Sequence, residues 1–190
     1  MEVRPARDTD LDRIAAIYAH YVEHSVATFE TEAPSVTSWR TRLGDLTERH
    51  LPFLVAEADG LVCGYAYAGP WRGRPAYQFS VEDAVYVAPG QGRRGIGSAL
   101  LGGLLDACTA AGRRQVIAVI ADSGDDSSVA LHNRFGFVQA GRLTEVGHKH
   151  GRWLDTVLMQ RTLSLGRYTA YALTPRRRQP AGPCPADRKW

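Results

Sequence analysis

The spacing of apolar and polar positions in the first fifty residues predicts two helices. After a short extended start at residues 2–4, residues 8–24 carry apolar and aromatic side chains at helical intervals, which places on one face Leu11, Ile14, Ile17, Tyr18 and Tyr21. Asp8 or Thr9 is expected to cap this helix. A loop then leads to a second helix, which we expect to start at residues 35–38 and to run toward residue 50.

The next segments have the patterns of strands. Two apolar runs, residues 53–57 and 61–68, flank the tight-turn dipeptide Asp59-Gly60 and predict a β-hairpin. A third strand is expected at residues 77–87. Residues 115–121, which read QVIAVIA, are apolar after the glutamine, as expected of a strand that is covered on both faces.

Helical and strand patterns alternate in the second half of the chain. The segment SALLGGLLDACTAAG predicts a helix that ends at Gly112, and a shorter helix is expected at residues 127–134, before Gly136. Two closing strands, residues 137–146 and 153–163, are separated by the segment GHKHGR. This order of elements predicts a mixed α/β domain built around one sheet.

Composition supports a single domain. The chain has 190 residues, 44% of them hydrophobic, which is enough for one substantial core and too few to make two ordinary domains the expectation. We expect that domain at residues 1–163. Residues 164–190 are rich in proline and arginine, contain six basic residues against one acid and show little apolar periodicity. They are expected to form a disordered extension.

Several classes of partner are not expected. Cys63, Cys108 and Cys184 lack metal-ligand spacing, so we expect reduced thiols and no metal site. The arginines at residues 176–178 have few aromatic neighbours, which is weak ground for nucleic-acid binding. No apolar run reaches the roughly 18 residues that span a bilayer, and the N-terminus MEVRPARDTD carries acids where a signal peptide would be apolar. A soluble, cytoplasmic protein without a membrane partner is expected.

A glycine-rich segment carries the clearest chemical signal. Residues 85–101 have the pattern of a strand, a tight turn and a helix, so backbone N–H groups at the helix start converge on the end of the strand. Such a place binds phosphates. Arg93 and Arg94 add positive charge, and Gly95 and Gly97 remove side chains where a diphosphate would approach the backbone. Alternatively, the glycines merely shape a surface turn.

The amino-acid sequence of this segment resembles a known motif. VYVAPGQGRRGIGSALL is similar to the acetyl-CoA-binding motif of the GNAT acetyltransferases, whose core is Gln/Arg-x-x-Gly-x-Gly/Ala. Further runs resemble the phosphinothricin and methionine sulfoximine N-acetyltransferases, namely YVEHSVATFETEAP, PFLVAEADGLVCGYAYAGPWRGRPAY, SVALHNRFGF and GHKHGRWLD. The resemblance covers about residues 2–163. It implies a GNAT fold, in which a mostly antiparallel central sheet is flanked by helices and splays at the cofactor site.

The resemblance also implies an activity. It indicates transfer of an acetyl group from acetyl-CoA to the α-amino group of a small acceptor such as phosphinothricin, methionine sulfoximine or methionine sulfone, by direct attack of the amine on the thioester. Glu82 matches the family's general base, and His132 is its candidate partner. Because relatives are commonly dimers, a homodimer is expected, with the two C-terminal strands as interface.

Cofactor-binding residues follow from the same resemblance. The pantetheine is expected along the backbone of Val85, Tyr86 and Val87, with their N–H groups near the thioester carbonyl. The diphosphate is assigned to Gly92, Arg93, Arg94, Gly95, Ile96, Gly97 and Ser98, and further contacts are assigned to Asp125 and Ser128. Two positions depart from the family: Gly92 replaces a glutamine or arginine, and Asp125 replaces an asparagine. Both departures bear on cofactor affinity.

The acceptor pocket is expected to offer cations and polar groups. By resemblance it is formed by Phe29, Thr31, Arg72, Arg74, Tyr77, Lys149 and Trp153. Arg74 is the best candidate for the acceptor's anionic end, because a guanidinium can hold two oxygens at once. Trp71 and Trp153 are expected to be packing residues rather than direct ligands.

Three other functions remain open from the sequence. Gly90, Gly92 and Gly95 also fit the dinucleotide motif Gly-x-Gly-x-x-Gly, with Asp122 after the next strand, although only one β-α-β unit is predicted. A domain that binds acetyl-CoA as a sensor without catalysis is a second possibility. The third is a GNAT enzyme that acts on a different amine or on a protein N-terminus.

Overall fold

The structure is a computed structural model that describes residues 1–163; the predicted extension, with Cys184 and the arginines at 176–178, lies outside the described residues. The strands are β1 (Glu2–Pro5), β2 (Phe53–Ala58), β3 (Leu61–Pro70), β4 (Ser80–Val87), β5 (Gln115–Ala121), β6 (Val138–Lys149) and β7 (Arg152–Thr162). The α-helices are α1 (Leu11–His24), α2 (Val36–Glu48), α3 (Ile96–Ala110) and α4 (Ser127–Arg134), and short 3-10 turns are η1 (Asp8–Asp10) and η2 (Pro75–Tyr77).

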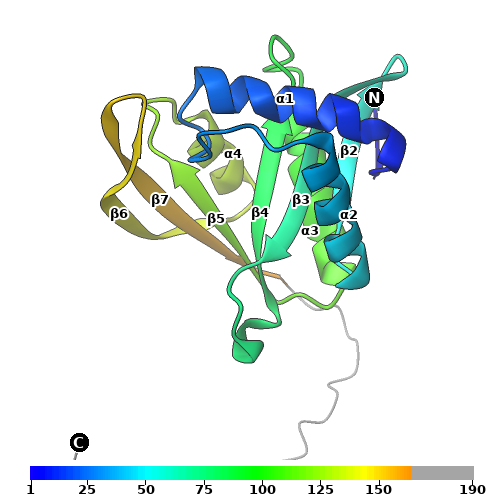
Figure 1. Cartoon of the computed structure of the whole chain (residues 1–190). Helices are drawn as coiled ribbons and strands as arrows, with labels where there is room; N and C mark the ends of the chain where they lie inside the picture. Colours follow the sequence, from blue (N-terminus) through cyan, green and yellow to red (C-terminus); the bar gives the residue numbers. More distant parts are fainter. Residues whose placement is uncertain (164–190) are drawn as a thin grey trace, which may run out of the picture.

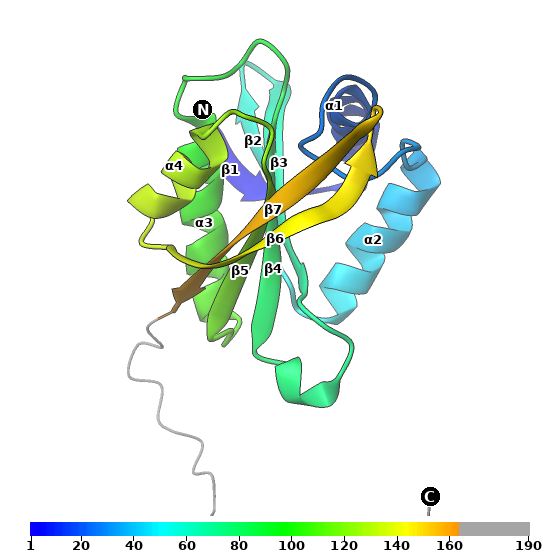
Figure 2. The same cartoon turned by 90° about the vertical axis from the view of Figure 1, so that its left-hand side faces the viewer.

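One seven-stranded sheet divides the molecule into layers. Its strand order is β1-β2-β3-β4-β5-β7-β6, and within it the pair β4–β5 is parallel while the other neighbours are antiparallel. Helices α1 and α2 cover one face, and α3 and α4 cover the other (Figures 1 and 2). The predicted mixed α/β sheet flanked by helices is confirmed.

The first helix follows its apolar stripe. Leu11, Ile14, Ile17 and Tyr18 of α1 are buried, as their spacing predicts. Its start differs from the prediction, because Asp8 and Thr9 form the turn η1 rather than a cap. Helix α2 begins as expected, and the Ser35 hydroxyl accepts a hydrogen bond from the Ser38 N–H at 3.1 Å.

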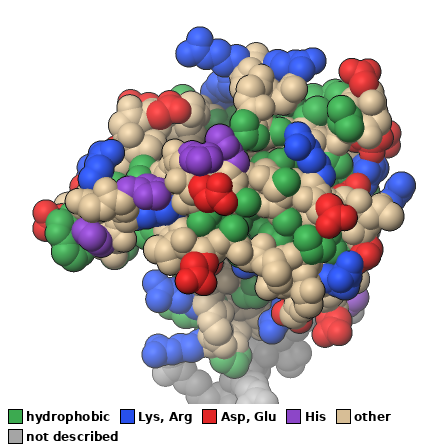
Figure 3. Space-filling model, turned by 45° about the horizontal axis from the view of Figure 1, so that its top comes forward, with side chains coloured by type: hydrophobic (Ala, Val, Ile, Leu, Met, Phe, Trp, Pro, Cys, Tyr) green, Lys and Arg blue, Asp and Glu red, His purple; other side chains and the backbone are tan. Residues whose placement is uncertain are grey.

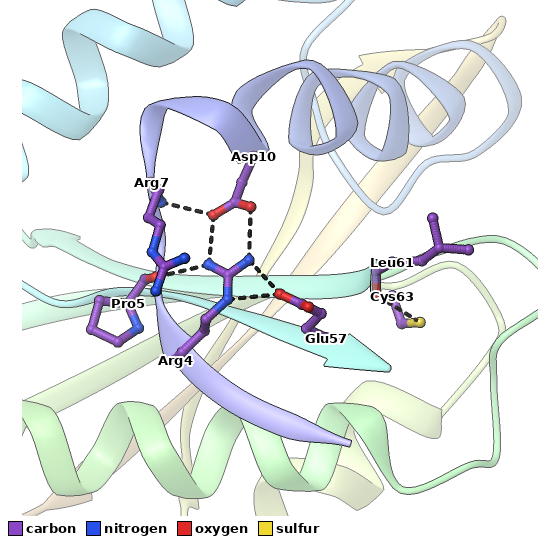
Figure 4. Close-up of polar contacts among 7 residues, drawn as sticks. All are labelled: Arg4, Pro5, Arg7, Asp10, Glu57, Leu61 and Cys63. Carbon is purple, nitrogen blue, oxygen red and sulfur yellow. Dashed lines mark hydrogen bonds and ion pairs between the residues drawn. The ribbon is translucent and has the colours of Figure 1, made fainter. Parts of the chain in front are cut away.

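An ion-pair network ties the first strand to the start of α1. The Arg4 guanidinium donates to both carboxylate oxygens of Asp10, at 2.8 and 2.9 Å, and also to Glu57 of β2 (Figure 4). Asp10 additionally accepts the backbone N–H of Arg7. These bonds hold the pKa of Asp10 below its usual value, chiefly through Arg4. The network therefore fixes where α1 leaves the sheet.

The sheet opens between β4 and β5. The two strands pair at three positions, Ser80–Gln115, Val81–Val116 and Glu82–Ile117, and then diverge (Figure 1). Beyond Glu82, this edge of β4 therefore has no strand partner among residues 1–163, whereas β5 stays paired with β7 along its length. The splay that the family resemblance implies is confirmed.

Three predictions about strands need correction. The third strand begins at Ser80, not at residue 77, because Pro75 starts the 3-10 turn η2. Most of the segment GHKHGR is strand, and the turn between β6 and β7 is confined to residues 150–151. The expectation that β5 is covered on both faces is wrong: alternate residues are buried, but Val119 is exposed beside the opening in the sheet.

The surface of the described residues carries side chains of mixed character, and the thiols lie inside. No helix within residues 1–163 is both long and apolar enough to cross a membrane. Basic, acidic and apolar side chains are interspersed on the face in Figure 3. Cys63 and Cys108 are buried free thiols, as predicted, and burial raises the pKa of Cys108 to about 12.

Candidate active site

The glycine-rich turn between β4 and α3 leaves backbone donors free. Gly95, the residue before α3, has a φ of 79° and offers no side-chain cap. The first intrahelical bond runs from the Ala99 N–H to the Gly95 carbonyl. The N–H groups of Ile96, Gly97 and Ser98 therefore have no intrahelical partner and point out of the helix start. Together with the helix dipole, they form a cradle for an anion.

Basic side chains surround this cradle. Arg94 donates to the side-chain oxygen of Gln91 within the turn, and Arg93 holds a left-handed backbone conformation with a φ of 63°. Arg134, at the end of α4, donates to the hydroxyl of Ser98. Arg134 could not be recognised from the sequence, because it contacts a residue 36 positions away.

Two glycines of the turn differ in how closely neighbouring side chains pack against them. A Cβ on Gly97 would lie 3.3 Å from a methyl group of Leu131 and 3.8 Å from one of Val87, so this glycine lets α3 pack closely on α4 and β4. Gly92 has no atom within 4 Å of such a Cβ, and its φ is not positive. Nothing in the local geometry therefore requires glycine at position 92.

The Asp125 carboxylate accepts hydrogen bonds from the start of α4. Its two carboxylate oxygens accept the N–H and the hydroxyl of Ser127, both at 2.9 Å. These bonds, with a smaller contribution from Arg93, lower the pKa of Asp125. The carboxylate is thus held by Ser127, the first residue of α4. Ser128 contributes its backbone carbonyl to His132.

Side chains of β4 alternate between the two faces of the sheet. Val85 and Val87 lie on the α3 side, as the contact of Val87 with Gly97 shows. Tyr86 points the other way, and its ring centroid lies 5.1 Å from that of Tyr18 in α1. Of the three predicted cofactor contacts on β4, Tyr86 can therefore offer only its backbone to a ligand on the α3 side.

Glu82 lies at the point where the sheet opens. It is the last residue of β4 that pairs with β5, and its side chain is on the α2 face. Burial raises the pKa of Glu82, the neighbouring charge of Asp83 raises it further, and Arg72 lowers it. A cavity of about 540 Å³ adjoins Glu82, and we call it the α2 cavity. It is lined by Ser38, Thr41, Arg42, Asp45, Leu46, Arg49, Tyr67, Gly69, Pro70, Glu82, Asp83 and Ala84.

His132 does not meet Glu82. Its Nε2 lies 2.9 Å from a carboxylate oxygen of Asp83, and its Nδ1 lies 2.7 Å from the Ser128 carbonyl. Asp83 follows Glu82 on the strand, so the two carboxylates point to opposite faces. The predicted pair of Glu82 with His132 is wrong, because the helix that carries His132 covers the α3 side of the sheet.

Both ring nitrogens of His132 face acceptors, so the ring carries two N–H groups when Asp83 is ionised. Burial lowers the pKa of His132, but the hydrogen bond and the charge of Asp83 outweigh it and raise the pKa overall. The side chain is 5% exposed. It has neither a free lone pair nor an open path to an acceptor in the α2 cavity.

The predicted acceptor-binding residues fall into two groups, and none of them lines the cavity beside Glu82. Arg72, Arg74 and Tyr77 surround a smaller pocket of about 230 Å³ in the exposed loop between β3 and β4. Arg72 is nevertheless close enough for its charge to act on Glu82.

The other group lies where the α1–α2 loop meets the β6–β7 hairpin. The ammonium of Lys149 is buried and donates to the Thr28 carbonyl at 2.9 Å, and burial lowers the pKa of Lys149. The ring of Phe29 lies directly over Gly147. Thr31 is exposed in the same loop. Trp153 is 65% exposed, with its ring beside His148, so the expectation that it is a packing residue is wrong.

Comparison with known proteins decides the family. The family model for the acetyltransferase (GNAT) domain matches residues 3–158. The chain belongs to the GNAT acetyltransferase family. Phosphinothricin N-acetyltransferase of Alcaligenes faecalis is similar to this GNAT chain at 50% identity over 167 residues, which cover 88% of the chain and 85% of that protein. L-methionine sulfoximine/L-methionine sulfone acetyltransferase of Salmonella typhimurium is 36% identical over 84% of the chain and 93% of that protein.

A solved structure agrees with this GNAT fold. The crystal structure of a GNAT superfamily phosphinothricin acetyltransferase from Sinorhizobium meliloti in complex with AcCoA superposes with a TM-score of 0.84 at 44% identity. The match covers 92% of this chain and 95% of that one. The family predicted from the sequence is confirmed. The dinucleotide-binding alternative is excluded, because it needs a doubly wound parallel sheet and residues 1–163 contain a single parallel pair of strands.

Proposed function

We propose that this GNAT chain transfers an acetyl group from acetyl-CoA to the α-amino group of a small amino-acid-like acceptor such as phosphinothricin, methionine sulfoximine or methionine sulfone. The names of the similar proteins support this choice of acceptors. The observation that carries the proposal is the position of Glu82, a half-buried carboxylate at the opening of the sheet. It lines a cavity of about 540 Å³ on the α2 face, and the strand that carries it, β4, leads to the anion cradle at the start of α3.

Acetyl-CoA would occupy the α3 side of the opening. The residues assigned to its diphosphate, from Gly92 to Ser98, include the free N–H groups at the start of α3. The edge of β4 from Asp83 to Val87 lacks a strand partner within residues 1–163, so its backbone groups can bond the pantetheine as a further strand would. Free N–H groups there would stabilise the oxyanion that develops on the thioester carbonyl.

The amine would lose its proton to Glu82. An α-amino group is largely protonated at neutral pH and cannot attack in that form. Glu82 accepts one proton, the neutral nitrogen bonds to the thioester carbon, and the carbon–sulfur bond breaks. The departing thiolate of coenzyme A takes up the proton that the new amide nitrogen loses, which gives the N-acetyl product and the free thiol. A raised pKa makes Glu82 a better base.

His132 would support this step indirectly. Its ion pair with Asp83 joins α4 to the residue that follows Glu82 on β4. We assign it the role of a positioning residue, which holds β4 in register where the strand loses its β5 partner. The assignment keeps His132 in the active site but removes it from proton transfer.

We further propose that the chain forms a homodimer and is located in the cytoplasm. Apolar side chains on β6 and β7 are exposed, namely Val138, Leu143, Val146 and Trp153. Such a surface supports a homodimer through these strands. Because acetyl-CoA is drawn from the cytoplasmic pool, we place the protein in the cytoplasm.

An acceptor panel tests the proposal. The purified chain is incubated with acetyl-CoA and either phosphinothricin, methionine sulfoximine, methionine sulfone or an ordinary amino acid, and free thiol and N-acetyl product are measured together. We expect stoichiometric thiol and product with at least one of the first three acceptors. Binding of acetyl-CoA with no product from any acceptor would instead support a sensor.

A further inference from the structure

The α2 cavity contains a guanidinium with no acidic partner. Nη1 of Arg42 donates to the Tyr67 hydroxyl at 3.0 Å, and the guanidinium carbon lies 4.7 Å from the Trp39 ring centroid and 5.3 Å from that of Tyr67. Among the ion pairs within residues 1–163, none involves Arg42. The aromatic rings fix the plane of the guanidinium and leave its remaining N–H groups free.

The surroundings of Arg42 favour an anionic ligand. The residue is half-buried, whereas Arg40, on the same helix, is exposed and paired with Asp8. Burial raises the pKa of Tyr67 to about 12, so Tyr67 is a neutral phenol at neutral pH. Its oxygen accepts from Arg42, and its own O–H remains available. Arg42 and Tyr67 together can therefore donate to two oxygens of one group.

Glu82 provides the opposite charge in the same cavity. In the register of β3 and β4, Tyr67 faces Ala84 and Gly69 faces Glu82, so Tyr67 and Glu82 share one face of the sheet. The absence of a side chain at Gly69 keeps the space before Glu82 open; an added Cβ would come no closer than 4.0 Å to the nearest atom, in the Tyr67 ring. The cavity thus combines a cation on α2 with a carboxylate on β4.

We propose that Arg42, oriented by Tyr67, binds the α-carboxylate of the acceptor and thereby directs its α-ammonium toward Glu82. This inference rests on the proposed function and gives it a specificity residue. A zwitterion satisfies both charges, whereas an amine without a neighbouring carboxylate satisfies one. Arg74, the sequence-based candidate, lies exposed in the β3–β4 loop. Water screens an exposed cation more strongly than a half-buried one, which favours Arg42 as the anchor.

The test compares an acid with its amide. Methionine sulfone and methionine sulfone carboxamide are assayed with the wild type, with Arg42→Gln and with the matched control Arg40→Gln. The readout is the ratio of kcat/KM for acid to amide, compared between variants, because that comparison cancels the different basicity of the two amines. We expect Arg42→Gln to lower this ratio by roughly 10- to 100-fold, as expected for losing charge-assisted bonds to a carboxylate. Arg40→Gln should leave the ratio unchanged.

The outcomes separate this inference from the proposed function. An equal loss for acid and amide in Arg42→Gln would assign Arg42 a purely structural role and overturn the inference, while acetyl transfer would stand. If the wild type acetylates neither compound, calorimetry with both compounds decides. Preference for the acid that is lost in Arg42→Gln would then support the carboxylate site without the proposed transfer, and equal binding of acid and amide by the wild type would overturn it.

Discussion

By the resemblance to the acetyl-CoA-binding motif, a glutamine or arginine is expected where this chain has Gly92. No atom lies near a Cβ built there and its φ is not positive, so a longer side chain fits without strain. We expect Gly92→Gln to fold normally and to tighten acetyl-CoA binding by about 2- to 10-fold, the effect of one added hydrogen bond. Calorimetric titration of acetyl-CoA measures it.

The control for this substitution is Gly44→Gln, since Gly44 also has no atom within 4 Å of an added Cβ but lies on α2. Its affinity for acetyl-CoA should equal that of the wild type. Weaker binding by Gly92→Gln would mean that a bare backbone at position 92 contacts the cofactor.

The ion pair of His132 with Asp83 gives a stability prediction. His132→Leu leaves the buried Asp83 carboxylate unpaired and should lower the free energy of unfolding by about 3–5 kcal/mol. In the double variant Asp83→Leu/His132→Leu the uncompensated charge is gone, and stability should return to that of the wild type or exceed it. Urea unfolding of the three proteins measures this. Additive losses in the double variant would contradict the assignment.

The same pair predicts a pH dependence of stability. Because the pKa of His132 is raised in the folded protein, its contribution is fully present below its unfolded value of 6.5 and is lost as the pH rises through the folded pKa. The wild type should therefore lose stability relative to the double variant as the pH rises above 6.5. Parallel stability profiles for the two proteins would argue against a charged His132.

Single residues could be proposed where a resemblance to a known motif carries the signal. Glu82 and the turn from Gly92 to Ser98 were assigned in this way and stay predictions; Glu82 lies where β4 and β5 diverge, and the turn lies directly before α3. Asp83 as the partner of His132 depends on packing between residues 49 positions apart, which no local pattern shows. Arg42 had a usable signal, because it is three residues after the buried Trp39 and hence on the same side of α2.

Two elements distant in sequence meet outside the α2 cavity but close enough that the charge of Glu30, in the α1–α2 loop, acts on Tyr67 of its lining. The α1–α2 loop is held to the β6–β7 hairpin by Lys149, which binds the Thr28 carbonyl, and by Phe29, which covers Gly147. A Cβ on Gly147 would lie 2.2 Å from the Phe29 ring, so Gly147→Ala must displace the ring. We expect a several-fold higher KM for the acceptor and an unchanged KM for acetyl-CoA.

Gly141→Ala is the matched control on β6. There the nearest atom, a methyl of Leu158, is 3.9 Å from the added Cβ, which is an ordinary contact. Steady-state kinetics with both substrates compare the two variants. Equal acceptor KM values for the two would show that the loop contact does not shape the acceptor site.

Element types were more predictable than element ends. The 3.6-residue spacing in α1 follows from burial of one face, and the continuous apolar runs in β2 and β3 follow from burial of both faces, so both element types were predicted correctly. The start of β4 was placed three residues early, because apolar residues such as Phe79 continue the strand pattern but are exposed in the loop. The exposed side of β5 could not be foreseen either, since the opening of the sheet depends on how β4 and β5 diverge.

At the scale of the whole molecule, the sites that we propose for the two substrates lie on opposite faces of one sheet. The anion cradle is at the start of α3, and the cavity beside α2 is lined by Glu82, where β4 and β5 diverge. The exposed apolar residues on β6 and β7 belong to the two strands beyond β5 in the strand order, with β6 at the edge of the sheet.

The central claim is that Glu82 takes the proton of an amine held in the α2 cavity, and the pH profile of kcat tests it most directly. The profile is measured for the wild type, for Glu82→Gln and for the matched control Glu48→Gln, whose side chain is exposed at the end of α2. We expect the wild type to lose activity as the pH falls through the raised pKa of Glu82, because a protonated base cannot accept a proton. Glu82→Gln should lower kcat by roughly 100-fold or more below the optimum, with acetyl-CoA binding intact. A wild-type profile retained by Glu82→Gln would contradict the account.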